Sequence, residues 1–318
     1  MFRRTPLFFT VVLLATGFCL FNPGSYFTLG LRDFGLPEVF AAPASTRDTT
    51  HLPAIRFITR GPVLKPETEE YLTKGIHFIY KFYITQLGYA FPENLTVVIR
   101  VFGDNRAYQA YTSHVTTSPI SSHVGLYIYN TREIVVWKGT NTAFFKKIVF
   151  HEVSHLLLRS RSRHCTRWLS EGLSEYFEEL DLSGGVPVVR PQHRKDNRTK
   201  RQLRAGKLPA LTAFLAQTDG QWSHKDNVSA LPRTLAWSLV YFLMDSEQGQ
   251  CLLKELLAYY QNHPVAPARL VFLVNTLSGP GSLAPLGPEM VVKLEKKWHQ
   301  WVVEQRAEHR VIRRFPCA

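Results

Sequence analysis

Two histidines flank a glutamate in the run His151-Glu152-Val153-Ser154-His155. Residues four apart lie on the same face of an α-helix, so both imidazoles can reach one ion at about 2.0 to 2.1 Å. Glu152 lies roughly 100° further round such a helix, which suits a base beside the ion and not a ligand. The spacing therefore predicts a zinc site able to activate water for hydrolysis.

A third ligand is expected from the segment Trp168-Leu169-Ser170-Glu171-Gly172. Catalytic zinc usually takes three protein ligands and keeps a fourth position for water. The chain between His155 and Glu171 is long enough for the first helix to end and a second helix to return beside it. We therefore expect Glu171 to complete the ligand set. Glu175, one helical turn later, is expected to accept a hydrogen bond from a ligand histidine and fix its tautomer.

The first of these two helices is expected to be buried. Its flanks are apolar almost all round, at Phe144, Phe145, Ile148, Val149, Val153, Leu156 and Leu157. Burying His151, Glu152 and His155 there without a metal or dense hydrogen bonding would cost several kcal/mol. We therefore favour the metal site over the alternative, a surface helix with incidental histidines.

Both motifs resemble those of the gluzincin branch of the MA clan of zinc metallopeptidases, and within it the bacterial peptidase-MA-like domains. The run from Trp168 to Phe177 is similar to the ligand helix of that family. Upstream, a helix ending near Tyr89 leads through Pro92 to a strand over 95–102, which is also similar. The resemblance covers residues 52 to about 305.

This resemblance implies peptide-bond hydrolysis with one Zn²⁺ per chain. His151, His155 and Glu171 would be the ligands, and Glu152 would be the general base and acid. The Gly-x-Met-Glu-Asn type of signature found in many aminopeptidases of the clan is absent, which favours an endopeptidase. In the resembled fold an edge strand pairs with extended substrate, and either 134–137 or 125–129 would do so here.

The chain departs from the family pattern at the oxyanion. Related peptidases supply a tyrosine or histidine from a later helix, but the helix expected over 231–244 carries Arg233 there. Tyr241 and His224 are substitutes, although Tyr241 could simply pack beside Trp237. Loss of one oxyanion donor typically costs about a hundredfold to a thousandfold in rate. The alternative function is therefore a catalytically weak or inactive zinc-binding domain, acting as an envelope binding or scaffolding module.

The expected fold class is α+β, zincin-like, with an N-terminal mixed β-sheet plus active-site helix and a C-terminal helical subdomain. The composition, 45% hydrophobic and 20% charged, is that of a globular protein. We place the domain at 45–310, with a sheet subdomain over about 52–160, a helical subdomain over about 161–306 and a tail over 307–318. Helices are expected over 67–87, 104–113, 173–181, 211–217, 231–244, 251–262 and 289–306, and strands over 95–102, 125–129 and 134–138.

Residues 1–44 are expected to form a signal peptide or signal anchor with a linker. Arg3 and Arg4 precede an apolar run from Pro6 to Phe21, and Asn22-Pro23-Gly24 follows it. Basic residues ahead of such a run place the following domain outside the cytoplasm. We therefore expect an exported, cell-envelope protein, periplasmic or extracytoplasmic, with or without an N-terminal transmembrane anchor.

A basic cluster contributes to the formal net charge of +13. Residues 187–207 contain eight Lys or Arg and one acid, Asp196. Aromatic residues are absent from this cluster, so nucleic acid is not expected as a partner. An anionic membrane or cell-wall surface is the favoured partner, with a peptide or protein as substrate; the alternative is an ordinary solvated loop.

Overall fold

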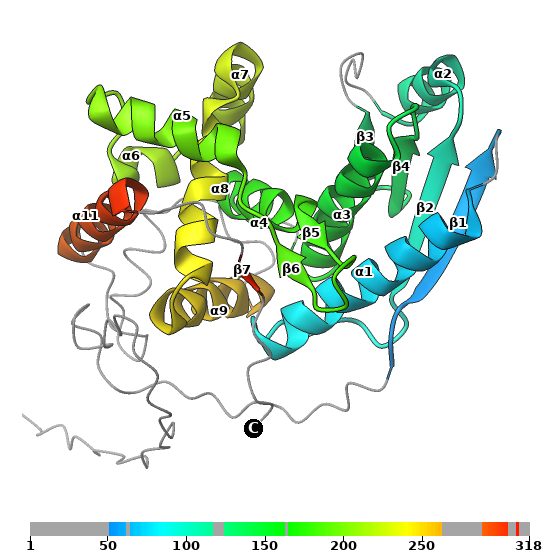
Figure 1. The fold of residues 1–318 in the computed structure, drawn as a ribbon, viewed down its shortest axis with the longest axis horizontal. Helices are drawn as coiled ribbons and strands as arrows, with labels where there is room; N and C mark the ends of the chain where they lie inside the picture. The colour runs from blue at the N-terminus through cyan, green and yellow to red at the C-terminus, as the bar shows by residue number, and fades with distance from the viewer. Residues whose placement is uncertain are drawn as a thin grey trace, which may run out of the picture.

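The computed structural model describes residues 51–61, 64–116, 124–162, 165–262, 288–304 and 310–311. The predicted signal segment over 1–44 and most of the tail over 307–318 lie outside these residues. Within the described ranges, no helix has both the length and the apolar character needed to span a membrane. The described chain is a mixed α+β protein, as predicted, with a small mixed sheet and many helices (Figure 1).

A four-stranded sheet has the order β1-β2-β4-β3. Its strands are β1 (Ala54–Arg60), β2 (Thr96–Phe102), β4 (Glu133–Trp137) and β3 (Gly125–Ile128). β1, β2 and β4 run parallel, while β3 pairs antiparallel with β4 through a tight turn at Arg132, which has a φ of 54°. β4 is thus an interior strand, so the prediction that 134–137 could be a free edge is wrong. β3 is the edge beside it.

Helices cover both faces of this sheet. α1 (Pro66–Thr85) and α3 (Thr142–Arg159) pack on the face that presents Val97, Ile99 and Val136. The shorter α2 (Asn105–Val115) packs on the opposite face, against Phe102 and Val135. The sheet therefore supports α3, the helix that carries both histidines, along its buried length.

The remaining helices form a second group that extends away from the sheet (Figure 1). They are α4 (Arg167–Glu178), α5 (His193–Arg204), α6 (Leu211–Leu215), α7 (Asp219–Ser229), α8 (Leu231–Met244), α9 (Glu247–Asn262) and α11 (Pro288–Glu304). A second, three-stranded sheet joins β5 (Leu180–Asp181), β6 (Val188–Val189) and β7 (Arg310–Val311). The sequence analysis did not predict β1, α5, α7 or this small sheet.

α4 and α8 approach each other closely at Gly172. A Cβ atom at this position would lie 2.5 Å from Val240 Cγ2 and 2.7 Å from the Ala236 carbonyl oxygen. Real Cβ atoms do not come so close to other atoms, so only glycine permits this packing. The contact holds the middle of α8 against the segment of α4 that contains Glu171.

Candidate metal centre

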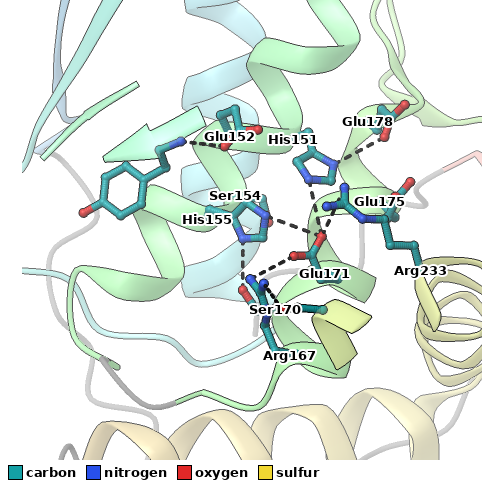
Figure 2. A network of polar contacts seen from close by, with 12 residues as sticks. His151, Glu152, Ser154, His155, Arg167, Ser170, Glu171, Glu175, Glu178 and Arg233 are labelled. Carbon is teal, nitrogen blue, oxygen red and sulfur yellow. Dashed lines mark hydrogen bonds and ion pairs between the residues drawn. The ribbon is translucent and has the colours of Figure 1, made fainter. Parts of the chain in front are cut away.

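The two histidines lie on the buried face of α3. Asn141 begins this helix, and its side-chain oxygen accepts a hydrogen bond from the Phe144 N–H at 3.0 Å. His151 and His155 are 5% and 9% exposed, and their ring centroids are 4.9 Å apart. Both imidazoles turn toward α4, as Figure 2 shows.

Glu171 meets both rings from α4. Its Oε2 atom lies 3.7 Å from His151 Nε2 and 3.8 Å from His155 Nε2. Two ligands held at about 2.1 Å from one zinc ion in tetrahedral geometry are separated by about 3.4 Å. The observed separations are close to this value and too long for hydrogen bonds.

Glu171 Oε2 is also buried without a hydrogen-bond partner. A buried carboxylate oxygen without a hydrogen bond is costly, and here the charge of Arg233, whose Nη1 lies 3.6 Å away, offsets part of its lost hydration. The three side chains the sequence named therefore fit a metal ion by both geometry and donor chemistry, and their candidate ligand atoms all lie within 4.8 Å of one another. Iron, cobalt and nickel would accept similar donors, while zinc suits a two-histidine, one-carboxylate set.

Each histidine has a further partner at its other ring nitrogen. Ser170 Oγ lies 2.9 Å from His155 Nδ1, and Glu178 Oε2 lies 3.3 Å from His151 Nδ1. Such partners fix the tautomer and orientation of a metal-binding imidazole. The sequence analysis predicted this role for Glu175. In the structure Glu178, two helical turns after Glu171, is the carboxylate that contacts the ring.

Glu175 instead connects the site to α5. Its carboxylate forms an ion pair with Lys195, and Gln192 Nε2 donates to the Glu175 backbone carbonyl at 2.8 Å. Burial raises the pKa of Glu175, and the neighbouring Glu178 adds to this rise. Ion pairs therefore link Glu175 to Lys195 and Glu178 to His151.

Glu152 points away from the other carboxylates and toward the edge strand. Its Oε2 accepts a hydrogen bond from the Tyr127 backbone N–H at 2.8 Å (Figure 2). Gly125 permits this close packing of β3 on α3, since a Cβ atom there would lie 2.3 Å from Ile148 Cγ2 and 3.3 Å from Glu152 Cγ. β3 therefore lies directly against the residue that the sequence assigned as a base.

The pKa values of these groups reflect burial and mutual charge. Burial raises the pKa of Glu152, as expected for a carboxyl removed from water. Burial also opposes protonation of both histidines and lowers the pKa of His155 well below 6.5. In His151 the hydrogen bond to Glu178 and nearby carboxylates outweigh burial and raise the pKa to about 9. Glu171 is buried too, but Arg233 and the two histidines hold its pKa below the ordinary range.

Of the candidates for the oxyanion, Arg233 is the one placed at the cluster. Its Nη1 lies 3.6 Å from Glu171 Oε2. Tyr241 is 1% exposed and packs in an aromatic group with Trp237, Tyr176 and Trp301. His224 lies on α7 and lines a cavity of about 450 Å³ with Phe214 and Leu235.

Four residues at this site were not predicted from the sequence: Ser170, Glu178, Tyr127 and Arg167, whose Nη1 donates to Glu171 Oε1 at 3.4 Å. Glu178 could have been predicted from helical spacing, because it lies two turns after Glu171 on the same face of α4. Tyr127 contributes a backbone N–H, for which no side-chain pattern exists.

Comparison with protein-family models gives a match over residues 147–266 to a family described as a protein of unknown function, DUF1570. The match covers less than half of the chain and includes both histidines, Glu171 and Arg233. No curated protein matches the sequence. The family description names no activity, so the chemistry must be argued from the residues.

Proposed function

We propose that this protein is a zinc metallopeptidase with a zincin-like fold. The observation that carries the proposal is the convergence of His151, His155 and a Glu171 oxygen that lacks a hydrogen bond at ligand-to-ligand distances, with a buried Glu152 next to them. A purely structural zinc site would not need this additional carboxylate. Its retention supports a hydrolase over a scaffold.

His151, His155 and Glu171 would hold the ion. When bound, zinc supplies a Lewis acid that acidifies water to a pKa near 7 and polarises a carbonyl. Glu152 would take the proton from water as the scissile carbonyl is attacked, and the same carboxyl would return it to the leaving amine. Its raised pKa suits a general base, because a carboxylate whose pKa is raised toward the operating pH accepts a proton more readily than an ordinary glutamate.

β3 supports a peptide as the substrate. It is the edge of the four-stranded sheet and lies against Glu152 through Tyr127 and Gly125. An extended peptide could add to this edge by main-chain hydrogen bonds, which would bring its carbonyl groups past the metal ligands. This geometry favours an endopeptidase that accepts chains extending on both sides of the scissile bond.

Arg233 and Tyr241 are the proposed candidates for stabilising the oxyanion, and the structure lets their roles be separated. Because Arg233 adjoins Glu171, Arg233→Gln should lower kcat by about a hundredfold or more with little change in melting temperature. Tyr241 is packed among aromatic rings, so Tyr241→Phe should leave kcat within a few-fold. Steady-state kinetics and thermal unfolding of both variants check this prediction. A larger loss of kcat in Tyr241→Phe than in Arg233→Gln would instead assign oxyanion stabilisation to Tyr241.

The alternative function is a catalytically weak or inactive zinc domain that acts as an envelope binding or scaffolding module. The arginine at the oxyanion position is what favours it. The two functions are separated by metal analysis of purified protein together with cleavage of a broad peptide library, with and without a chelator. Stoichiometric zinc and chelator-sensitive cleavage support the peptidase; zinc without any cleavage supports the module.

We further propose an exported, envelope location with an anionic membrane or cell-wall surface as partner. Most of the basic cluster forms the helix α5, whose Lys195 and Lys200 are engaged in ion pairs with Glu175 and Asp196. Arg194, Arg201 and Arg204 are exposed on the same helix. These three, and not the two paired lysines, are suited to meet an anionic surface.

Replacing Arg194, Arg201 and Arg204 together by glutamine should weaken binding to phosphatidylglycerol vesicles at low salt by about tenfold or more, since each basic residue near such a surface contributes about 1 kcal/mol. Co-sedimentation at two salt concentrations measures the effect, because exposed charges are screened within about 10 Å at 0.1 M salt. The matched control removes the same charge elsewhere, with Lys65, Lys81 and Arg106 replaced by glutamine. Equal binding by both triple variants would make α5 an ordinary solvated helix.

A further inference from the structure

Arg167 and Arg233 both occupy the first turn of a helix. Arg167 is the first residue of α4 and Arg233 the third residue of α8, and neither helix has an acidic residue in its first turn. Unpaired N–H groups make a helix N-terminus positive, so acids are favoured there and cations are disfavoured. Two helices therefore depart from the usual preference at one place, which is typical of a functional site.

Both guanidinium groups turn toward Glu171 without engaging it closely. Arg167 Nη1 lies 3.4 Å from Glu171 Oε1 and Arg233 Nη1 lies 3.6 Å from Oε2 (Figure 2). Close charge-assisted pairs are about 2.7 to 2.9 Å apart. Each arginine side chain is 31% exposed, so solvent and a ligand can reach it. Arg167 Nη2 also lies 3.5 Å from Ser223 Oγ on α7, which directs the group.

The carboxylates near the site are shared among several positive groups. Glu175 is paired with Lys195, and Glu178 is paired with His151. Glu171 faces both guanidinium groups, but under the proposed function its carboxylate would also neutralise part of the charge of a divalent ion. The open side of the site would then carry surplus positive charge, which attracts anions.

We propose that Arg167 receives a carboxylate of the substrate, with Arg233 adding to the positive potential. The protein would then prefer peptides that have an acidic side chain or a free C-terminal carboxylate next to the scissile bond. The guanidinium fork of arginine matches a carboxylate with two parallel hydrogen bonds. This inference rests on the proposed function and adds a substrate class to it.

Binding to the zinc-loaded Glu152→Gln variant tests the inference without requiring hydrolysis. Three acetylated hexapeptide libraries are compared by affinity selection and mass spectrometry: neutral with an amidated C-terminus, the same with one glutamate, and neutral with a free C-terminus. At least one acidic library should bind about tenfold more tightly than the neutral one, the value expected for one charge-assisted contact. Comparison of the glutamate library with the free C-terminus library shows whether the site binds an acidic side chain or a C-terminal carboxylate.

Adding Arg167→Gln should remove this preference, so that the acidic and neutral libraries bind with equal affinity. Arg167→Lys keeps the charge but loses the fork, so it should retain part of the preference; it also serves if the glutamine variant does not fold. Arg194→Gln, exposed on α5, is the control and should keep the full preference. Equal binding of the three libraries, or a preference that survives Arg167→Gln, overturns the inference. Absence of cleavage by the unmodified protein overturns the proposed function alone, because the carboxylate preference is measured separately.

Discussion

Replacing His151 and His155 together by alanine should reduce bound zinc from about one ion per chain to near zero. Each single change, including Glu171→Ala, should weaken zinc binding by more than about a hundredfold, since even partners outside the ligand set are worth tenfold to a hundredfold. Glu178→Gln should weaken zinc binding by about tenfold to a hundredfold. This variant leaves the His151 ring in place but removes the carboxylate at its Nδ1. Mass-spectrometric metal analysis and competition with a chromophoric chelator give these values.

Glu152→Gln is the matched control in this series, because Glu152 is directed at Tyr127 and not at the ligand cluster. It should keep full zinc content. The double histidine variant also removes a second group of potential ligands, formed by His151, Glu175 and Glu178. Stoichiometric zinc in that variant would therefore contradict any metal centre built on His151.

The parts of this molecule that follow from local spacing could be predicted from the sequence. The four-residue interval places His151 and His155 on one face of α3, and the apolar run Leu231–Met244 gives the bounds of α8. The pairing of Glu171 with both rings needed one further assumption, that the next helix returns beside the first. The α+β class followed from the same periodicities.

The parts that depend on polar burial or on distant pairing could not be predicted. α5 turns Asp196 and Thr199 inward, so its buried face lacks the apolar stripe that marks a helix in a sequence. The choice between 125–129 and 134–137 as the free edge was set by the parallel pairing of β2 with β4 across α2. Both segments are apolar, so their composition could not decide.

Arg233 illustrates a different limit. A tyrosine was expected at this position by resemblance, and the arginine was a departure whose meaning depended on its surroundings. Gly172 brings α8 so close to α4 that the Arg233 side chain reaches Glu171, whereas Tyr241 on the same helix packs beside Tyr176. Helical periodicity placed both residues on α8, but it could not say which of them α4 would bring to the site.

Glu152→Gln should abolish peptide hydrolysis while fold and zinc content stay unchanged. The amide is nearly isosteric and its oxygen can still accept the Tyr127 N–H, so the local structure is retained. An amide cannot take a proton from water or return one to an amine, and loss of a general acid–base group typically costs about a hundredfold to ten-thousandfold. Cleavage of the peptide library by matched zinc-loaded samples measures the loss, with thermal unfolding as the check on fold.

This experiment distinguishes the two functions because Glu152 has a different role in each of them. In a peptidase the carboxyl handles a proton in every turnover, so the variant loses activity that the unmodified protein has. In a binding module Glu152 would only hold β3 against α3 through Tyr127, and glutamine preserves that contact. Equal absence of cleavage in both proteins, with zinc present in both, would therefore replace the peptidase by the module and leave the metal centre itself intact.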